Sequence, residues 1–226
     1  MSIYALVGAV ICLAASPYLA RLTASVPDRE IADWWRGRPV GHDVLARTAL
    51  AAAVFGALAG SVPGRAALVP AYVWLALLAA PLTVIDLALH RLPDRLMVPL
   101  AVGGAALVSA GLLAHDTDVH TWLRAVEAAA AVFAVLFLLA FVAPRSFGLG
   151  DVKLGGVLGG YLGVAGWAYV YYGIFAGFVL GTVVAIVVLA TRRGGMKTAI
   201  PFGPMLVLGA LLVLAFHLVP SLFTTG

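Results

Sequence analysis

The chain is short of cysteine and of charge, and each shortage excludes a class of protein. Its single cysteine, Cys12, stands inside an apolar run, which excludes a disulfide framework and a zinc site built from several cysteines. Only 11% of the 226 residues are charged, whereas 63% are hydrophobic. A soluble domain cannot bury so many apolar side chains, so we expect an integral membrane protein. The net charge of +4 does not indicate nucleic-acid binding, because the cations flank apolar runs.

The apolar residues form long runs that are separated by short polar pieces. Each run approaches the roughly 20 residues that a helix needs to cross the hydrocarbon core. The period-two alternation of barrel strands is missing, so the spans must be helical. A glycine-flanked break at 163–166 divides one run that is too long for a single span. We therefore predict one domain, residues 1–226, with an all-α, polytopic fold of about eight spans. The predicted spans are 2–20, 46–63, 67–86, 96–114, 122–143, 152–165, 167–190 and 200–220.

The basic residues gather on one side of this predicted topology. Twelve of the fourteen Lys and Arg residues flank the odd-numbered connections, and Arg65 and Arg124 fall on the other side. By the positive-inside rule, the odd-numbered connections are cytoplasmic and both termini face outward from the inner (plasma) membrane. The polar segment 23–44 is then a short cytoplasmic segment. Because it contains Trp34 and Trp35, we expect it to lie at the level of the lipid headgroups.

Two aspartates fall at the same predicted membrane boundary. Asp86 closes the span 67–86, and Asp151 stands directly before the span 152–165. Ionisable groups near the hydrocarbon cost about 2.5 to 3.5 kcal/mol each, so we interpret them as functional. Two carboxylates that share a site do not ionise equally, so one can activate water while the other donates a proton to a carbonyl oxygen. Asp86, at a helix C-terminus, would be the protonated partner.

Three residues around the second aspartate would shape the site. Gly148 and Gly150 would let a peptide backbone approach closely or would supply a positive φ before the helix. Lys153 follows Asp151 by two residues, so on a regular helix it points to another face. We expect its ammonium group to reach lipid phosphates or acidic groups of a substrate.

Other features have plainer interpretations. Pro93 ends the preceding structure, and Asp94 is expected to be a turn residue or the N-cap of the next helix. Both are also candidate substrate-binding or site-shaping residues. Taken alone, Asp86 is equally explained as a solvated loop carboxylate, and Asp151 as a cap. The glycines of 155–160 are expected to form a helix-packing face. The histidines are scattered without the spacing of metal ligands, so no metal site is expected.

Three segments carry a resemblance to a known family. They are 85–94, with Ile85-Asp86-Leu87 and Leu92-Pro93-Asp94; 147–154, with Gly148-Leu149-Gly150-Asp151; and 199–204, with Ile200-Pro201-Phe202-Gly203-Pro204. In this order they resemble the prepilin leader peptidases, the aspartic peptidases that process type IV pilins and share a Gly-x-Gly-Asp motif with presenilin-like enzymes. The matching segments extend over more than half of the chain.

The resemblance implies an enzyme, an intramembrane aspartyl peptidase of type IV pilus assembly or protein secretion. Its catalytic residues would be Asp86 and Asp151, and it would cleave leaders from pilin or pseudopilin precursors at the cytoplasmic boundary without a cofactor. Its partners would be these precursors and membrane lipids. Larger family members carry two cysteine pairs that bind zinc after the first span and are linked to N-methylation of the product. The segment 23–44 has no cysteine, which excludes such a zinc site and speaks against methyltransferase activity.

A small proton-coupled transporter that uses the same aspartates as a relay is the alternative. A transporter predicts polar groups at mid-membrane depth and often a repeated half of the chain. Here the two acids lie at one boundary, and no halves match. The peptidase is therefore the favoured hypothesis.

The predicted topology can be tested with reporter fusions. A reporter fused after Arg193 is expected to be active only if it functions in the cytoplasm, and one fused at Asp116 only if it functions outside. The distribution of the basic residues places these two positions on opposite sides of the membrane. Reporter activity in intact cells measures both. The reverse pattern would contradict the common depth of the two aspartates.

Overall fold

The structure is a computed structural model, and it describes residues 3–27, 33–62, 66–114, 119–142, 148–191 and 201–219. Within these ranges every regular element is a helix, which confirms the predicted all-α class. The elements are α1 (Ile3–Ser25), η1 (Trp34–Arg36), α2 (His42–Gly60), η2 (Ala66–Leu68), α3 (Val69–Leu89), α4 (Asp94–Leu113), α5 (Val119–Val142), α6 (Leu149–Ala165), α7 (Trp167–Ala190) and α8 (Gly203–Phe216).

Each predicted span corresponds to one of these α-helices, and the chain is a polytopic helical membrane bundle. The α6–α7 break lies where it was predicted, because Gly166 adopts a φ of 140°, which side chains with a Cβ rarely adopt. By length and composition, six described helices could cross a membrane, but α6 and α8 have only 17 and 14 residues. α1 continues to Ser25 and α2 begins at His42, so both helices extend into the predicted cytoplasmic segment 23–44.

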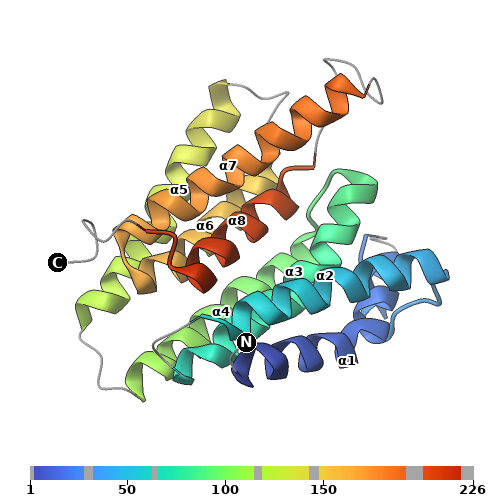
Figure 1. Ribbon diagram of the computed structural model, residues 1–226, viewed down its shortest axis with the longest axis horizontal. Coiled ribbons are helices and arrows are strands. Elements are labelled where there is room, and N and C mark those ends of the chain that lie inside the picture. Colours follow the sequence, from blue (N-terminus) through green and yellow to red (C-terminus); the bar gives the residue numbers. More distant parts are fainter. Residues whose placement is uncertain are drawn as a thin grey trace.

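The helices pack as an antiparallel bundle with two groups (Figure 1). One group contains α1 to α4, in which α2 packs on both α1 and α3; the other contains α5 to α8, with close pairs α5–α6 and α7–α8. Contacts of α8 with α2 and α3, and of α4 with α6, join the groups. Successive helices run in opposite directions, so the ends of α1, α3, α5 and α7 lie beside the starts of α2, α4, α6 and α8. We call this the site end of the bundle.

The site end is also the basic end of the described structure. All described Lys and Arg residues except Arg124 belong to segments at this end. Arg124 lies at the start of α5, at the opposite end, and its guanidinium donates to the carbonyl oxygens of Gly163 (2.7 Å) and Val164 (3.1 Å). These are last-turn carbonyls of α6, which have no partner within the helix. The exception to the charge pattern therefore has a structural role, capping α6.

The segment 33–41, between α1 and α2, folds back onto α1. The hydroxyl of Tyr18 donates to the Trp35 carbonyl at 2.6 Å, and that of Ser25 donates to the Trp34 carbonyl at 2.7 Å. The guanidinium of Arg95, in the first turn of α4, lies 5.9 Å from the centroid of the Trp34 ring. This cation–π contact links the segment to the start of α4. Its location among lipid headgroups stays a prediction.

Small residues on α6 let α5 approach closely. A Cβ on Gly159 would lie 2.7 Å from the Ala128 carbonyl oxygen, and one on Gly155 would meet a methyl group of Leu136. At Gly159, where the neighbour is backbone, no larger side chain fits unless the helices separate. The prediction that the glycines of 155–160 form a packing face is confirmed. This packing places the first turn of α6, and with it Asp151.

Neighbouring glycines on α6 offer a matched test of this packing. Gly159→Ala is expected to lower the free energy of unfolding by about 1–3 kcal/mol, because its Cβ would overlap α5 backbone. Gly160→Ala is the control, since its Cβ would meet ordinary contacts at 3.6 Å and 3.7 Å. Thermal unfolding in detergent compares the two variants. Equal stabilities would show that α5 and α6 do not pack at this distance.

Candidate active site

Asp86 is a buried carboxylate near the end of α3. Its side chain lies within the last turn of the helix, and the residue is only 4% exposed. Its Oδ2 accepts a hydrogen bond from the backbone N–H of Gly203, the first residue of α8, at 3.2 Å. A Cβ on Gly203 would itself lie 3.0 Å from this oxygen, so the glycine makes room for the contact. A buried carboxylate needs such a donor, because burial without one is costly.

Asp151 lies in the first turn of α6. Its Oδ2 accepts a hydrogen bond from the backbone N–H of Gly148, the N-cap residue, at 3.4 Å. The positive end of the helix dipole favours a negative charge at this position. Its Oδ1 is buried and has no hydrogen-bond partner among the described residues. Such atoms are rare in proteins, so this oxygen is a candidate for contact with water or substrate.

The structure brings the two predicted aspartates together. Asp86 and Asp151 are close enough to interact electrostatically, as two carboxylates of like charge. Leu92, in the connection between α3 and α4, packs against the glycines beside both of them. A Cβ on Gly150 would lie 3.0 Å from the Leu92 Cβ, and one on Gly203 would lie 3.4 Å from the Leu92 Cδ1. The ends of α3, α6 and α8 therefore meet around one leucine.

Two site residues were missed by the sequence-based prediction. Gly203 falls in the third matching segment, which was the available signal, but it was not assigned to the site. Thr83 precedes Asp86 by three residues, on the same face of α3. Its buried hydroxyl has no hydrogen-bond partner among the described residues, whereas the hydroxyls of Thr48 and Thr182 donate to the carbonyl four residues earlier. Thr83 therefore holds an uncommitted hydroxyl one turn from the carboxylate.

Lys153 and Asp94 form an ion pair between the first turns of α6 and α4. The Lys153 Nζ lies 2.6 Å from the Asp94 Oδ1, with side chains 48% and 64% exposed. This pairing was not predicted, because Lys153 was expected to reach phosphates or a substrate. The N-cap prediction for Asp94 is wrong: Pro93 is the N-cap, and Asp94 is the first residue of α4. The first turn of a helix favours a carboxylate, and the lysine of the neighbouring helix reaches it there.

Gly148 and Gly150, the glycines of the Gly-x-Gly-Asp motif, do not adopt unusual backbone angles. Gly148 has a φ of −83°, and Gly150 lies inside α6 and is not among the described residues with positive φ. The expectation of a positive φ is therefore wrong at both positions. At Gly150 the close neighbour is the side chain of Leu92, and the approach of a peptide backbone stays a prediction.

The chemistry that this arrangement can perform is proton transfer by a carboxylate pair. Each aspartate has one oxygen held by a backbone N–H, which orients the group. Within the described ranges no three His, Cys, Asp or Glu side chains form a metal-binding group. The pair is thus suited to activating water beside a carbonyl group.

Comparisons with known proteins agree with the geometry. Residues 71–186 match the model of the type IV leader peptidase family, and this range contains Asp86 and Asp151. A prepilin leader peptidase/N-methyltransferase from Stutzerimonas stutzeri is 34% identical over 126 residues. That match covers 55% of this chain and 42% of the relative, so the chain spans less than half of the relative's length. No solved structure matches the chain significantly. The family match confirms the resemblance found in the sequence.

The energy of the Asp94–Lys153 pair can be measured in a double-mutant cycle. Asp94→Ala, Lys153→Ala and the double variant are expected to give a coupling of about 0.2–1 kcal/mol, because both side chains are half exposed. Unfolding in detergent provides the free energies. The exposed pair Asp43–Arg47, at 4.0 Å on α2, is the control and should give a similarly small value. A coupling several times larger than the control would mean that the pair is shielded from water.

Proposed function

Since the chain belongs to the type IV leader peptidase family, we propose that it is an aspartic endopeptidase that removes leaders from type IV pilin or pseudopilin precursors. The observation that supports this proposal most strongly is the pair Asp86 and Asp151. The pair lies at one end of an apolar bundle, within the region that matches the family. A carboxylate pair supplies the acid and the base that hydrolysis of a peptide bond requires. The family match favours this function over the transporter.

In the proposed reaction one carboxylate takes a proton from water while the other, protonated carboxyl donates its proton to the scissile carbonyl oxygen. The oxygen of the water bonds to the carbonyl carbon, which gives a tetrahedral diol. The C–N bond then breaks: the nitrogen receives a proton from the first carboxyl, and one diol hydroxyl returns a proton to the second. The products are a new carboxyl group and a new amine, and the pair regains its starting state.

Helix polarity supports the assignment of the two roles. Asp151, in the first turn of α6, is proposed as the base, because the helix N-terminus stabilises its negative charge. Asp86, in the last turn of α3, is proposed as the initial proton donor, because the helix C-terminus disfavours an anion. Gly148 and Gly203 are positioning residues that hold one oxygen of each carboxylate.

The proposed location of the reaction is the cytoplasmic boundary of the inner membrane. The cations of the described structure support it, because they gather at the site end and the cytoplasmic side of membrane proteins is enriched in Lys and Arg. We propose the peptidase step alone. The segment 23–44 lacks the cysteine pairs that the resemblance links to methylation.

Removing ionisation without changing shape tests the proposed pair. Asp86→Asn and Asp151→Asn are each expected to lower precursor cleavage by about 10² to 10⁴-fold, because an amide can neither accept the proton of water nor donate one to the carbonyl. The double variant should be hardly worse than either single one, since the two groups act as a unit. Gel mobility of a prepilin precursor, in membranes with matched enzyme levels, measures the cleavage.

Two further variants serve as controls for this test. Asp43→Asn makes the same exchange on an exposed residue at the site end and should cleave normally. Asp94→Asn should keep substantial cleavage, because the amide oxygen still accepts a hydrogen bond from Lys153. Substantial activity of either Asp86→Asn or Asp151→Asn would overturn the pair. If Asp94→Asn does not cleave while Asp86→Asn does, the first catalytic residue is Asp94 rather than Asp86.

A further inference from the structure

Two buried polar atoms at the candidate active site have no hydrogen-bond partner. Among the described residues, the buried side-chain atoms of this kind are the Thr83 Oγ1, the Asp151 Oδ1 and the Tyr161 hydroxyl. Asp151 belongs to the carboxylate pair, and Thr83 precedes Asp86 by three residues on α3. Native proteins rarely leave buried polar groups unpaired, because nothing then offsets the cost of their burial. The proposed reaction uses the two aspartates and gives the Thr83 hydroxyl no role.

Thr83 does not adopt the arrangement of other helical threonines in this chain. The hydroxyl of a threonine inside a helix commonly donates to the carbonyl four residues earlier. Thr48, Thr182 and Thr191 each make this bond at 2.8 Å. Thr83 is only 9% exposed, and its hydroxyl makes no such bond. The hydroxyl is therefore buried but still available to a partner outside the backbone of its own helix.

The direction of side chains on α3 brings the Asp86 carboxylate toward this hydroxyl. Residues three apart on a helix lie on one face, with Cβ atoms about 5–6 Å apart. Each Cα–Cβ bond tilts toward the helix N-terminus, so the side chain of Asp86 leans over the turn that contains Thr83. A threonine in a helix has two accessible χ1 rotamers. The hydroxyl can therefore turn toward the carboxylate without a change in the backbone.

The Asp86 carboxylate has one fixed donor, and its other oxygen can accept a second hydrogen bond. The backbone N–H of Gly203 donates to Oδ2 at 3.2 Å, and a backbone N–H can only donate. In the proposed reaction Asp86 begins as a neutral carboxyl and becomes an anion when its proton passes to the scissile carbonyl oxygen. A buried anion is costly unless donors reach it. The Thr83 hydroxyl can rotate to donate at that moment, because a hydroxyl is free to turn about its C–O bond.

We propose that Thr83 is a positioning residue that acts through Asp86, and that its hydroxyl donates to the Asp86 Oδ1 when this carboxyl loses its proton. The inference rests on the proposed function and adds a third polar side chain to the site. Because the hydrogen bond forms together with the anion, it stabilises the transition state and not the bound substrate. Hydrogen bonds to an ionised acceptor are also stronger than neutral ones. When the diol returns a proton to Asp86, the starting arrangement is restored.

Replacing the hydroxyl with a methyl group tests this role. Thr83→Val keeps the shape of the side chain and is expected to lower kcat for a prepilin precursor by about 10- to 10²-fold, the effect of losing a hydrogen bond to a charged group. KM should stay within about twofold, because the lost bond is absent from the substrate complex. Thr83→Ser restores the hydroxyl and should recover most of the rate. Gel mobility at matched enzyme levels, over a range of precursor concentrations, measures kcat and KM.

Thr48→Val is the matched control for this exchange. Thr48 is fully buried in α2, and its hydroxyl donates to the Val44 carbonyl of the same helix, so kcat and KM should not change. Thermal unfolding in detergent separates a role in the reaction from a role in folding. Thr83→Val should be at least as stable as the unmodified protein, because the exchange removes a buried hydroxyl that has no partner among the described residues.

A double variant tests whether the hydroxyl acts through Asp86. The amide of Asp86→Asn does not ionise, so Thr83 has no anion to stabilise in this background. Adding Thr83→Val is therefore expected to lower the residual single-turnover cleavage by less than about twofold. A further fall of about tenfold or more would mean that the hydroxyl acts directly on water or substrate, and would overturn the inference.

The two proposals can fail separately. If the unmodified protein does not cleave the precursor, the proposed function is wrong. If it cleaves, and Thr83→Val cleaves equally well, the proposed function stands and Thr83 has no role in it. A higher KM with an unchanged kcat, no recovery in Thr83→Ser, or a lower stability of Thr83→Val would also overturn the inference.

Discussion

The burial of the Asp86 carboxylate is the constraint on which the arrangement of this end of the bundle depends. An ionisable group inside an apolar bundle is destabilising unless a donor reaches it, and here the donor is the backbone N–H of Gly203. This hydrogen bond joins residues 117 positions apart in the chain and ties the end of α3 to the start of α8. Because Leu92 packs beside the same glycine and beside Gly150, the start of α6 is brought to the same place.

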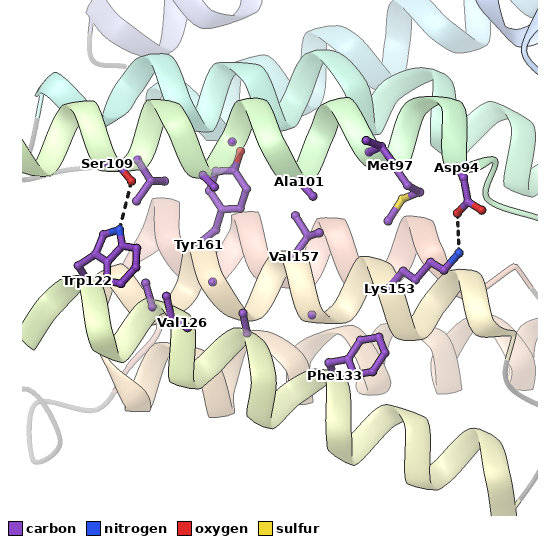
Figure 2. A pocket seen from close by; sticks show the side chains of 18 residues that line it. Asp94, Met97, Ala101, Ser109, Trp122, Val126, Phe133, Lys153, Val157 and Tyr161 are labelled. Atoms are coloured by element: carbon purple, nitrogen blue, oxygen red, sulfur yellow. Dashed lines mark hydrogen bonds and ion pairs between the residues drawn. The ribbon is translucent and has the colours of Figure 1, made fainter.

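Close packing of α6 on α5 complements this constraint. The glycines of α6 draw it against α5, and the hydrogen bonds from Arg124 hold the far end of α6. α6 packs closely on α5 and only lightly on α4, so a groove with a volume of about 710 Å³ remains between the three helices (Figure 2). The same packing that places Asp151 therefore also leaves this groove, which begins at Lys153 on α6. Site and groove are two results of a single helix arrangement.

Polar groups near the site are held in two different ways. Asp86 and Asp151 each have one oxygen tied to a backbone N–H, which neither titrates nor changes rotamer. Lys153 and Asp94 are tied only to each other and are half exposed, so water competes with their attraction. A rigid pair beside an exchangeable one suits the proposed peptidase, whose two carboxylates would have to stay fixed while a precursor enters and leaves.

The sequence by itself determined the helical membrane class and the position of each helix to within a few residues, and it pointed to the proposed pair of aspartates, because apolar run length and isolated charges are local properties of the chain. It also placed the break at Gly166, where only a residue without a Cβ fits easily. Only the tertiary structure decided the Gly203–Asp86 contact, the Thr83 hydroxyl that has no partner among the described residues, the partner of Lys153 and the groove. Each of these depends on which helices become neighbours across more than 50 residues of chain, and on side-chain directions that no local pattern specifies.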